Sequence, residues 1–199
     1  MDILKEWDLT RQELDEIVSA CPGLRGSMLR YVAEYKLRKM WFSGPKFGHV
    51  IPSDDPNLTC DGYLGLIYKA TTIKVELKSL RTASVRKTGD GLRGTIMCDA
   101  GDTRNLRLPD GSEAETGCLL AGQFDILAVN VFEFEKKWNF AFALNDDLPR
   151  STFAKHTEYQ RRHLLKMFVR LTWPLKPPFT DDPRPLLEQL ARRRQRKRR

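Results

Sequence analysis

Residues 71–79 read Thr71-Thr72-Ile73-Lys74-Val75-Glu76-Leu77-Lys78-Ser79, and β-branched or apolar residues alternate with polar ones along most of this segment. A period of two is typical of a β-strand with one buried face. Ile73, Val75 and Leu77 are then expected to point into a core, and Lys74, Glu76 and Lys78 to point to the other face. The segment therefore predicts a carboxylate and an ammonium group, Glu76 and Lys78, on one face of a rigid element.

A second apolar run, Tyr63-Leu64-Gly65-Leu66-Ile67-Tyr68, precedes this strand. We expect the two runs to form a β-hairpin that turns near Lys69-Ala70, which brings Asp61 and Glu76 to the same end of a sheet. The resulting order, Asp61-x14-Glu76-x-Lys78, supplies two acidic oxygen donors and a lysine. Asp54 and Asp55 are alternatives to Asp61, but they belong to a turn cluster further from Glu76.

The order Asp61-x14-Glu76-x-Lys78 resembles the PD-(D/E)xK nuclease superfamily, which includes restriction endonucleases and DNA-repair nucleases. The resemblance covers residues 24–145. It implies an α/β (α+β) fold with a restriction-endonuclease-like core, in which helices flank a central mixed β-sheet of four to five strands. Many members carry a glutamate on the helix before the sheet, and Tyr31-Val32-Ala33-Glu34 looks like that helix. The alternative for Glu34 is an intrahelical ion pair, worth only about 0.3–0.5 kcal/mol.

Hydrolysis of a phosphodiester bond requires an activated water and neutralisation of the charge that develops on the phosphate oxygens, and Mg²⁺ can supply both. Mg²⁺ prefers one or two carboxylates in an octahedral set of oxygen ligands. The expected ligands are Asp61, Glu76, the Leu77 backbone carbonyl and, from the resemblance, Glu34; Mn²⁺ is the expected substitute metal. Lys78 would position or deprotonate the attacking water. The alternative is that Glu76 and Lys78 form only a surface ion pair.

The remaining chain predicts several further elements. Thr10-Arg11-Gln12-Glu13 is a capping box that starts a helix ending near Ala20, and a longer helix is expected at 24–42. Its apolar stripe comprises Leu24, Met28, Tyr31, Val32 and Tyr35. Strands are expected at 47–52, at 124–132 and, as a hairpin partner of the latter, at 138–144. A second capping box predicts a helix over 157–170, and Asp182-Pro183 begins a last helix that includes Leu190.

A helix is expected after the Glu76 strand in the superfamily, but residues 82–117 contain six glycines and lack a helical pattern. The segment is therefore interpreted as a long loop or a ribbon insertion. Basic residues in and beside it are candidates for contacts with phosphates or guanine edges, namely Arg81, Arg86, Lys87, Arg93, Arg104 and Arg107. Asp125 begins an apolar run, where it is either a third site carboxylate or a cap of the strand.

The composition fits one domain with appendages: the chain has 199 residues, and 41% of them are hydrophobic. We expect a nuclease-like domain over 1–190, with an insertion at 82–117 and a helical appendage at 151–190. The basic run 192–199 holds seven of the positive charges, so the formal net charge of +8 falls to +1 without it, and 191–199 is expected to be a disordered tail. The four cysteines are widely spaced and no signal peptide or membrane span is evident, which indicates reduced thiols and a cytoplasmic location.

These observations lead to three hypotheses. The first is a Mg²⁺-dependent endodeoxyribonuclease of restriction or repair type that hydrolyses double-stranded DNA. The second is a non-catalytic nucleic-acid-binding protein with a nuclease-like fold. The third is an interaction module whose basic tail docks an acidic partner. A homodimer would suit double-strand cleavage, but the sequence alone shows no dimerisation signal.

Overall fold

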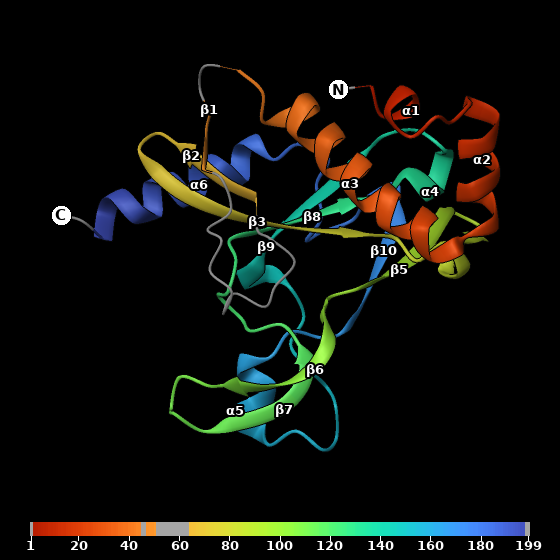
Figure 1. The fold of residues 1–199 in the computed structure, drawn as a ribbon. Coiled ribbons are helices and arrows are strands. Elements are labelled where there is room, and N and C mark those ends of the chain that lie inside the picture. Colours follow the sequence, from red (N-terminus) through yellow and green to blue (C-terminus); the bar gives the residue numbers. More distant parts are fainter. Residues whose placement is uncertain (1, 45–46, 51–63, 198–199) are drawn as a thin grey trace.

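A mixed five-stranded sheet is built around β3 (Thr71–Ser79) in the structure, a computed structural model that describes residues 2–44, 47–50 and 64–197 (Figure 1). Its strand order is β1-β2-β3-β8-β9, and only β3 and β8 run parallel. The other members are β1 (Phe47–Val50), β2 (Leu64–Tyr68), β8 (Ile126–Asn130) and β9 (Phe140–Leu144). The expected mixed central sheet is therefore confirmed.

The hairpin β2–β3 turns at the two residues that the sequence indicates. Lys69 and Ala70 both have positive φ, 48° and 57°. Two successive positive φ angles characterise the tight turn whose twist matches that of paired antiparallel strands. The register, with Leu64 opposite Val75, fixes the faces of β3: Ile73 and Val75 are fully buried on one face, and Glu76 is buried on the other.

Each face of the sheet packs against a different layer. On the Ile73 face lie α3 (Pro22–Trp41) and α6 (Arg184–Lys197), which contribute Leu37 and Leu187 to the core. On the opposite face lies a second sheet of order β10-β5-β4, which contributes Ile96 and Val169. Its strands are β4 (Arg86–Thr88), β5 (Gly91–Met97) and β10 (Phe168–Trp173). Because both faces are covered, β8 and β9 are buried at every position.

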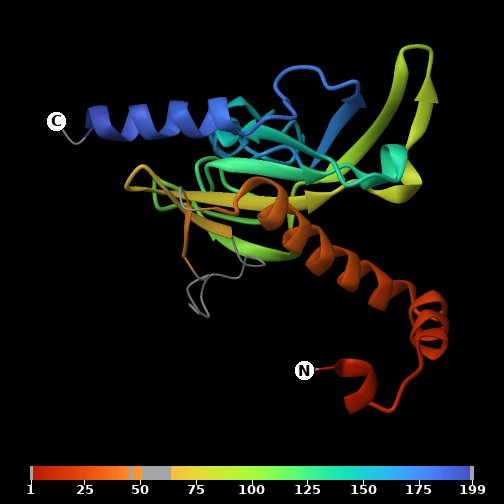
Figure 2. The ribbon, with the colours of Figure 1, turned by 90° about the horizontal axis from the view of Figure 1, so that it is seen from above.

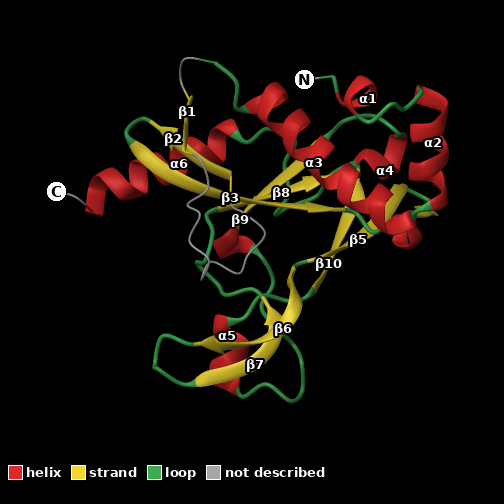
Figure 3. Ribbon diagram, viewed as in Figure 1, coloured by secondary structure: helices red, strands yellow, loops and turns green. Residues whose placement is uncertain are grey.

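The glycine-rich segment is a ribbon, which decides between the two interpretations of its sequence. After a short 3₁₀ turn (Thr82–Ser84) it forms the hairpin β4–β5 and then the hairpin of β6 (Asp99–Arg107) and β7 (Glu113–Cys118). The β6–β7 hairpin extends below the central sheet beside α5 (Glu158–His163) in Figure 3. Two hairpins thus connect the parallel strands β3 and β8, a connection that is more often a helix.

Two expectations near the C-terminus are corrected. The helix expected over 157–170 ends at His163, because Leu164 and Leu165 form bridges with Leu120 and Arg150 and the chain then pairs with β5 as β10 from Phe168 onward. The run expected to be disordered is helical as far as Lys197 in α6. Its Ala191 is buried and its Arg193 pairs with Asp146 at 2.9 Å, so the like charges are partly compensated by the body of the protein.

The N-terminal helices α1 (Ile3–Glu6) and α2 (Arg11–Ala20) lead into α3, and Figure 2 shows them extending away from the sheets. The stripe predicted to be the buried side of α3 is exposed; Ala33 and Leu37 are buried instead. A further short helix, α4 (Phe132–Glu135), separates β8 from β9. Within the described ranges, no helix is both long enough and apolar enough to cross a bilayer.

Candidate functional site

Glu76 and Lys78 form a close ion pair on the face of β3 that points away from α3. The Lys78 Nζ lies 3.0 Å from Glu76 Oε1, and the two side chains are 16% and 3% exposed. Alternate residues of a strand share a face, so the spacing Glu-x-Lys places the two groups side by side. The pairing predicted from the sequence is therefore observed, but it is buried rather than a surface pair.

The insertion supplies further groups around this pair. Lys78 Nζ also donates a hydrogen bond of 2.7 Å to the backbone carbonyl of Asp99, at the start of β6. The preceding residue, Cys98, is fully buried, and burial raises the pKa of its thiol to about 12 although the Lys78 ammonium opposes the shift. The ribbon thus fixes the lysine head group from the side that the central sheet leaves open.

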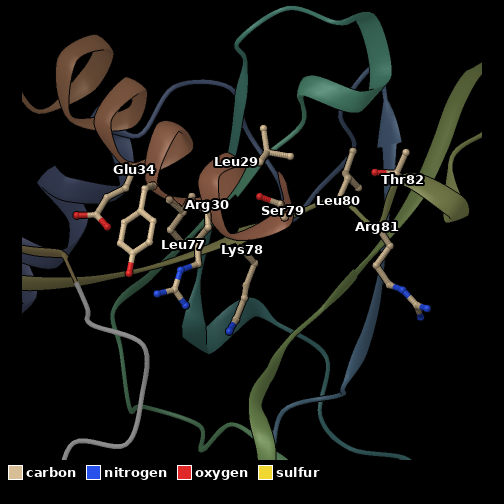
Figure 4. A pocket seen from close by; sticks show the side chains of 11 residues that line it. Leu29, Arg30, Glu34, Leu77, Lys78, Ser79, Leu80, Arg81 and Thr82 are labelled. Carbon is tan, nitrogen blue, oxygen red and sulfur yellow. The ribbon is translucent and has the colours of Figure 1, made fainter. Parts of the chain in front are cut away.

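A pocket of about 560 Å³ opens between α3 and the end of β3 (Figure 4). It is lined by Arg30 and Glu34 of α3, by Lys78 and by Arg81 just after the strand. In Figure 4 the Lys78 and Arg30 side chains extend in a similar direction, whereas the Glu34 carboxylate points away from Lys78. Glu34 Oε1 instead lies 2.5 Å from Arg38 Nη2, so the structure shows the intrahelical ion pair that was the alternative for this residue.

The structure describes three of the four expected metal ligands, namely Glu34, Glu76 and Leu77. Asp61 and the alternatives Asp54 and Asp55 lie outside the described residues, and Leu77 packs its side chain into the core beneath α3. Among the described residues no group of three or more His, Cys, Asp or Glu side chains forms a metal site. What the structure provides is oxygen donors near Lys78, namely the Glu76 carboxylate and the Asp99 carbonyl, which suit a hard cation such as Mg²⁺.

Asp125 lies at the other end of β3. Its carboxylate accepts a 2.7 Å hydrogen bond from the Lys74 backbone N–H and pairs with Arg194 of α6 at 2.5 Å. The Asp125 N–H in turn donates to the Lys74 carbonyl at 2.8 Å. This arrangement matches the capping alternative, in which Asp125 holds the start of β8 against β3 and α6.

Arginines gather on the outer face of the β10-β5-β4 sheet. Arg86 lies directly opposite Arg93, and Thr95 lies opposite Arg170. Together with Ser84, Thr95 and Thr172, these three arginines line a cleft of about 430 Å³. Like charges directly opposite one another are destabilising in a sheet. Within the described part of the chain no carboxylate pairs with Arg93 or Arg170, so this face carries an uncompensated positive charge.

Arg81 connects this face with the pocket. Arg81 lines the pocket, and its backbone N–H donates a hydrogen bond of 3.0 Å to the Thr95 carbonyl. Its guanidinium lies 5.7 Å from the ring centroid of Phe168 on β10. This outer surface of the sheet therefore includes Arg81 at its edge next to the pocket. We call it the arginine face, defined by Arg81, Arg86, Arg93 and Arg170.

The other predicted phosphate contacts lie elsewhere. Lys87 is exposed on β4 next to Arg86, but it lies on the opposite side of that strand. Arg104 is half-buried on the β6–β7 hairpin. Arg170 was missed because its segment was interpreted as the end of a helix; the alternation of apolar Val169, Leu171 and Trp173 with polar Arg170 and Thr172 is the signal that would have identified a strand.

Comparison of the chain with protein-family models, with curated proteins and with solved structures found no match. The functional argument therefore depends on the geometry of these residues.

Proposed function

We propose that the protein is a metal-dependent endonuclease of the PD-(D/E)xK type that acts on double-stranded DNA. The observation that carries this proposal is the Glu76–Lys78 contact of 3.0 Å on the rigid strand β3, with Lys78 lining an open pocket. A mixed sheet with α3 packed against one face is consistent with a restriction-endonuclease-like core.

In this proposal Glu76 holds Mg²⁺ together with Asp61 and the Leu77 carbonyl, and the metal supplies an activated water and charge neutralisation. Mn²⁺ is expected to replace it. Lys78 is already fixed by the Asp99 carbonyl and Glu76, so its ammonium needs little reorganisation to orient the attacking water. Glu34 would have to leave Arg38 before it could contact the metal or its water, and its role is therefore the least supported.

The arginine face supplies the expected contacts with the DNA backbone. Guanidinium groups bind phosphate oxygens in a bidentate manner, and the hydroxyl group of Thr95, which also lines the cleft, adds a donor that suits phosphates. Because Arg81 lines the same pocket as Lys78 and contacts Phe168 of the β10-β5-β4 sheet, a backbone bound on the arginine face would lie next to this pocket.

The experiment is cleavage of supercoiled plasmid at low salt with Mg²⁺, Mn²⁺ or EDTA. Wild type should nick or linearise the plasmid only with a metal, and Glu76→Gln and Lys78→Met should each lower the rate at least 100-fold. Lys74→Met is the matched control because Lys74 is an exposed lysine of the same strand and should leave cleavage unchanged. Metal-dependent cleavage that persists in both site variants would reject the assigned site.

A second function is favoured by one specific observation: the Lys78 ammonium forms its ion pair with Glu76 and its hydrogen bond with the Asp99 carbonyl, both groups of the protein itself, which suits a structural ion pair. The protein would then be a non-catalytic nucleic-acid-binding protein with a nuclease-like fold. Wild type would fail to cleave with any metal, and its salt-sensitive binding of DNA would be equal in EDTA and Mg²⁺.

A further inference from the structure

Helix α3 has two apolar faces on opposite sides, and the part of the chain that the structure describes buries only one of them. Ala33 and Leu37 are fully buried beneath the helix. The five apolar residues of the predicted stripe are 37–64% exposed, although they repeat at helical spacing: Leu24, Met28, Tyr31, Val32 and Tyr35. At 3.6 residues per turn these five lie within an arc of about 100°, roughly opposite the buried pair. We call this surface the α3 stripe.

The helices before α3 expose further apolar residues. Ile3, Trp7 and Ile17 are 42–60% exposed on α1, α2 and the turn between them. None of the residues of α1 or α2 is buried. Large exposed apolar surfaces mark interaction sites on proteins. A patch that follows three consecutive elements requires an explanation beyond single exposed side chains.

Charge indicates what covers this surface. Residues 2–20 contain six acidic and two basic residues, whereas α3 contains five basic residues and Glu34. The acidic arm and the basic helix are therefore complementary to each other. Lys36, Arg38 and Lys39 lie near the C-terminal end of α3, and the acidic arm is attached to its N-terminal end.

We propose that the α3 stripe and the α1–α2 arm form a two-fold interface with a second copy of this chain. In an antiparallel pair of α3 helices, the arm of each copy comes beside the basic C-terminal end of the other helix. A two-fold axis uses the same patch twice, so a surface that carries both an apolar stripe and two opposite charge blocks is self-complementary.

The size of the surface supports the participation of the arm. A helix of 20 residues is about 30 Å long and about 10 Å wide, so one of its faces covers about 300 Å². Each partner in a specific interface buries a larger area, roughly 800 Å². The arm before α3 exposes three more large apolar side chains, Ile3, Trp7 and Ile17, that a second copy can cover. Tyr31 and Tyr35 are already flanked by Arg30 and Lys39, whose cationic groups lie 5.2 and 5.0 Å from the ring centroids.

The test is the mass of the full chain in solution, by sedimentation equilibrium at about 5 to 50 µM. Wild type should have twice the 23.0 kDa of one chain, and Met28→Asp should have the mass of one chain with unchanged circular dichroism. Met40→Asp is the matched control. Met40 is an exposed methionine of the same helix, 46% against 37% for Met28, but it points about 120° away from Met28 and should leave the dimer intact.

Three outcomes would overturn the proposal. Wild type with the mass of one chain would show that a second copy does not cover the stripe. A dimeric Met28→Asp would place the interface elsewhere. If Met28→Asp weakens DNA binding while the mass of the wild type remains that of one chain, the basic helix contacts nucleic acid instead. Nuclease activity does not enter any of these outcomes, so the test is independent of the proposed function.

Discussion

At the scale of single residues, burial of the Glu76–Lys78 pair affects both the stability of the fold and the chemistry of the candidate site. Glu76 is 2% exposed, so its carboxylate depends on Lys78 and its other neighbours for compensation. Removing one partner of a buried pair leaves the other charge in a site of low polarity, whereas replacing both can be nearly neutral. A double-mutant cycle separates these cases.

We expect Lys78→Met to lower the free energy of unfolding by up to about 3–5 kcal/mol, toward the lower end because Lys78 keeps 16% exposure. Glu76→Gln/Lys78→Met should cost less than the sum of the two single changes. Urea unfolding of the four proteins measures the coupling. Additive effects would mean that the pair contributes no coupling energy and that its closeness has another cause.

Cys98 gives a prediction for pH. Burial raises the pKa of its thiol from 9.0 to about 12, so the thiol is protonated in both folded and unfolded chains below pH 9. Between pH 9 and 12 only the unfolded chain ionises, and the free energy of unfolding should fall by up to about 1.4 kcal/mol per pH unit. The stability difference between wild type and Cys98→Ala should therefore shrink from pH 8 to pH 10 in EDTA. An equal difference at both pH values would contradict it.

Asp125 distinguishes a structural carboxylate from a catalytic one. Asp125→Asn removes the charge paired with Arg194 but keeps an acceptor for the Lys74 N–H. We expect a loss of about 1 kcal/mol or less in stability, because the Arg194 side chain is 37% exposed. The rate of metal-dependent plasmid cleavage at a temperature well below unfolding should not change. A large loss of cleavage with normal stability would identify Asp125 as a third carboxylate of the catalytic site.

At the scale of elements, the sequence predicts β2, β3, β8 and β9 well because alternation or continuous apolar character is strong in them. It fails for β10, where Leu164, Leu165 and Phe168 imitate a helical period and pairing with β5 decides the outcome. The sequence also fails to predict which face of α3 is buried, because apolar residues repeat at helical spacing more regularly on the exposed stripe than on the buried face of Ala33 and Leu37. The site pair was predictable from strand spacing, but the Asp99 carbonyl reaches the pair, and Arg170 joins the arginine face, only through tertiary pairing.

The β10-β5-β4 sheet carries a prediction about binding. Each lysine or arginine that neutralises a phosphate adds about 0.9 to the slope of log affinity against log salt concentration on duplex DNA. We expect Arg93→Ala and Arg170→Ala each to weaken binding several-fold and to reduce this slope by about one. Arg11→Ala on the exposed α2 is the control. Fluorescence anisotropy with a labelled duplex at several salt concentrations measures both quantities, and unchanged slopes would exclude the arginine face.

At the scale of the whole molecule, an α3-mediated dimer would link stability to protein concentration. Association favours only the folded chain, so a tenfold increase in concentration should add about 1.4 kcal/mol per mole of dimer to the free energy of unfolding. The urea midpoint of wild type should therefore rise with concentration, whereas that of Met28→Asp should stay constant and that of Met40→Asp should rise like wild type. A constant wild-type midpoint across the concentrations at which a dimer sediments would mean that association does not stabilise the fold, and that the arm pairs without supporting the core.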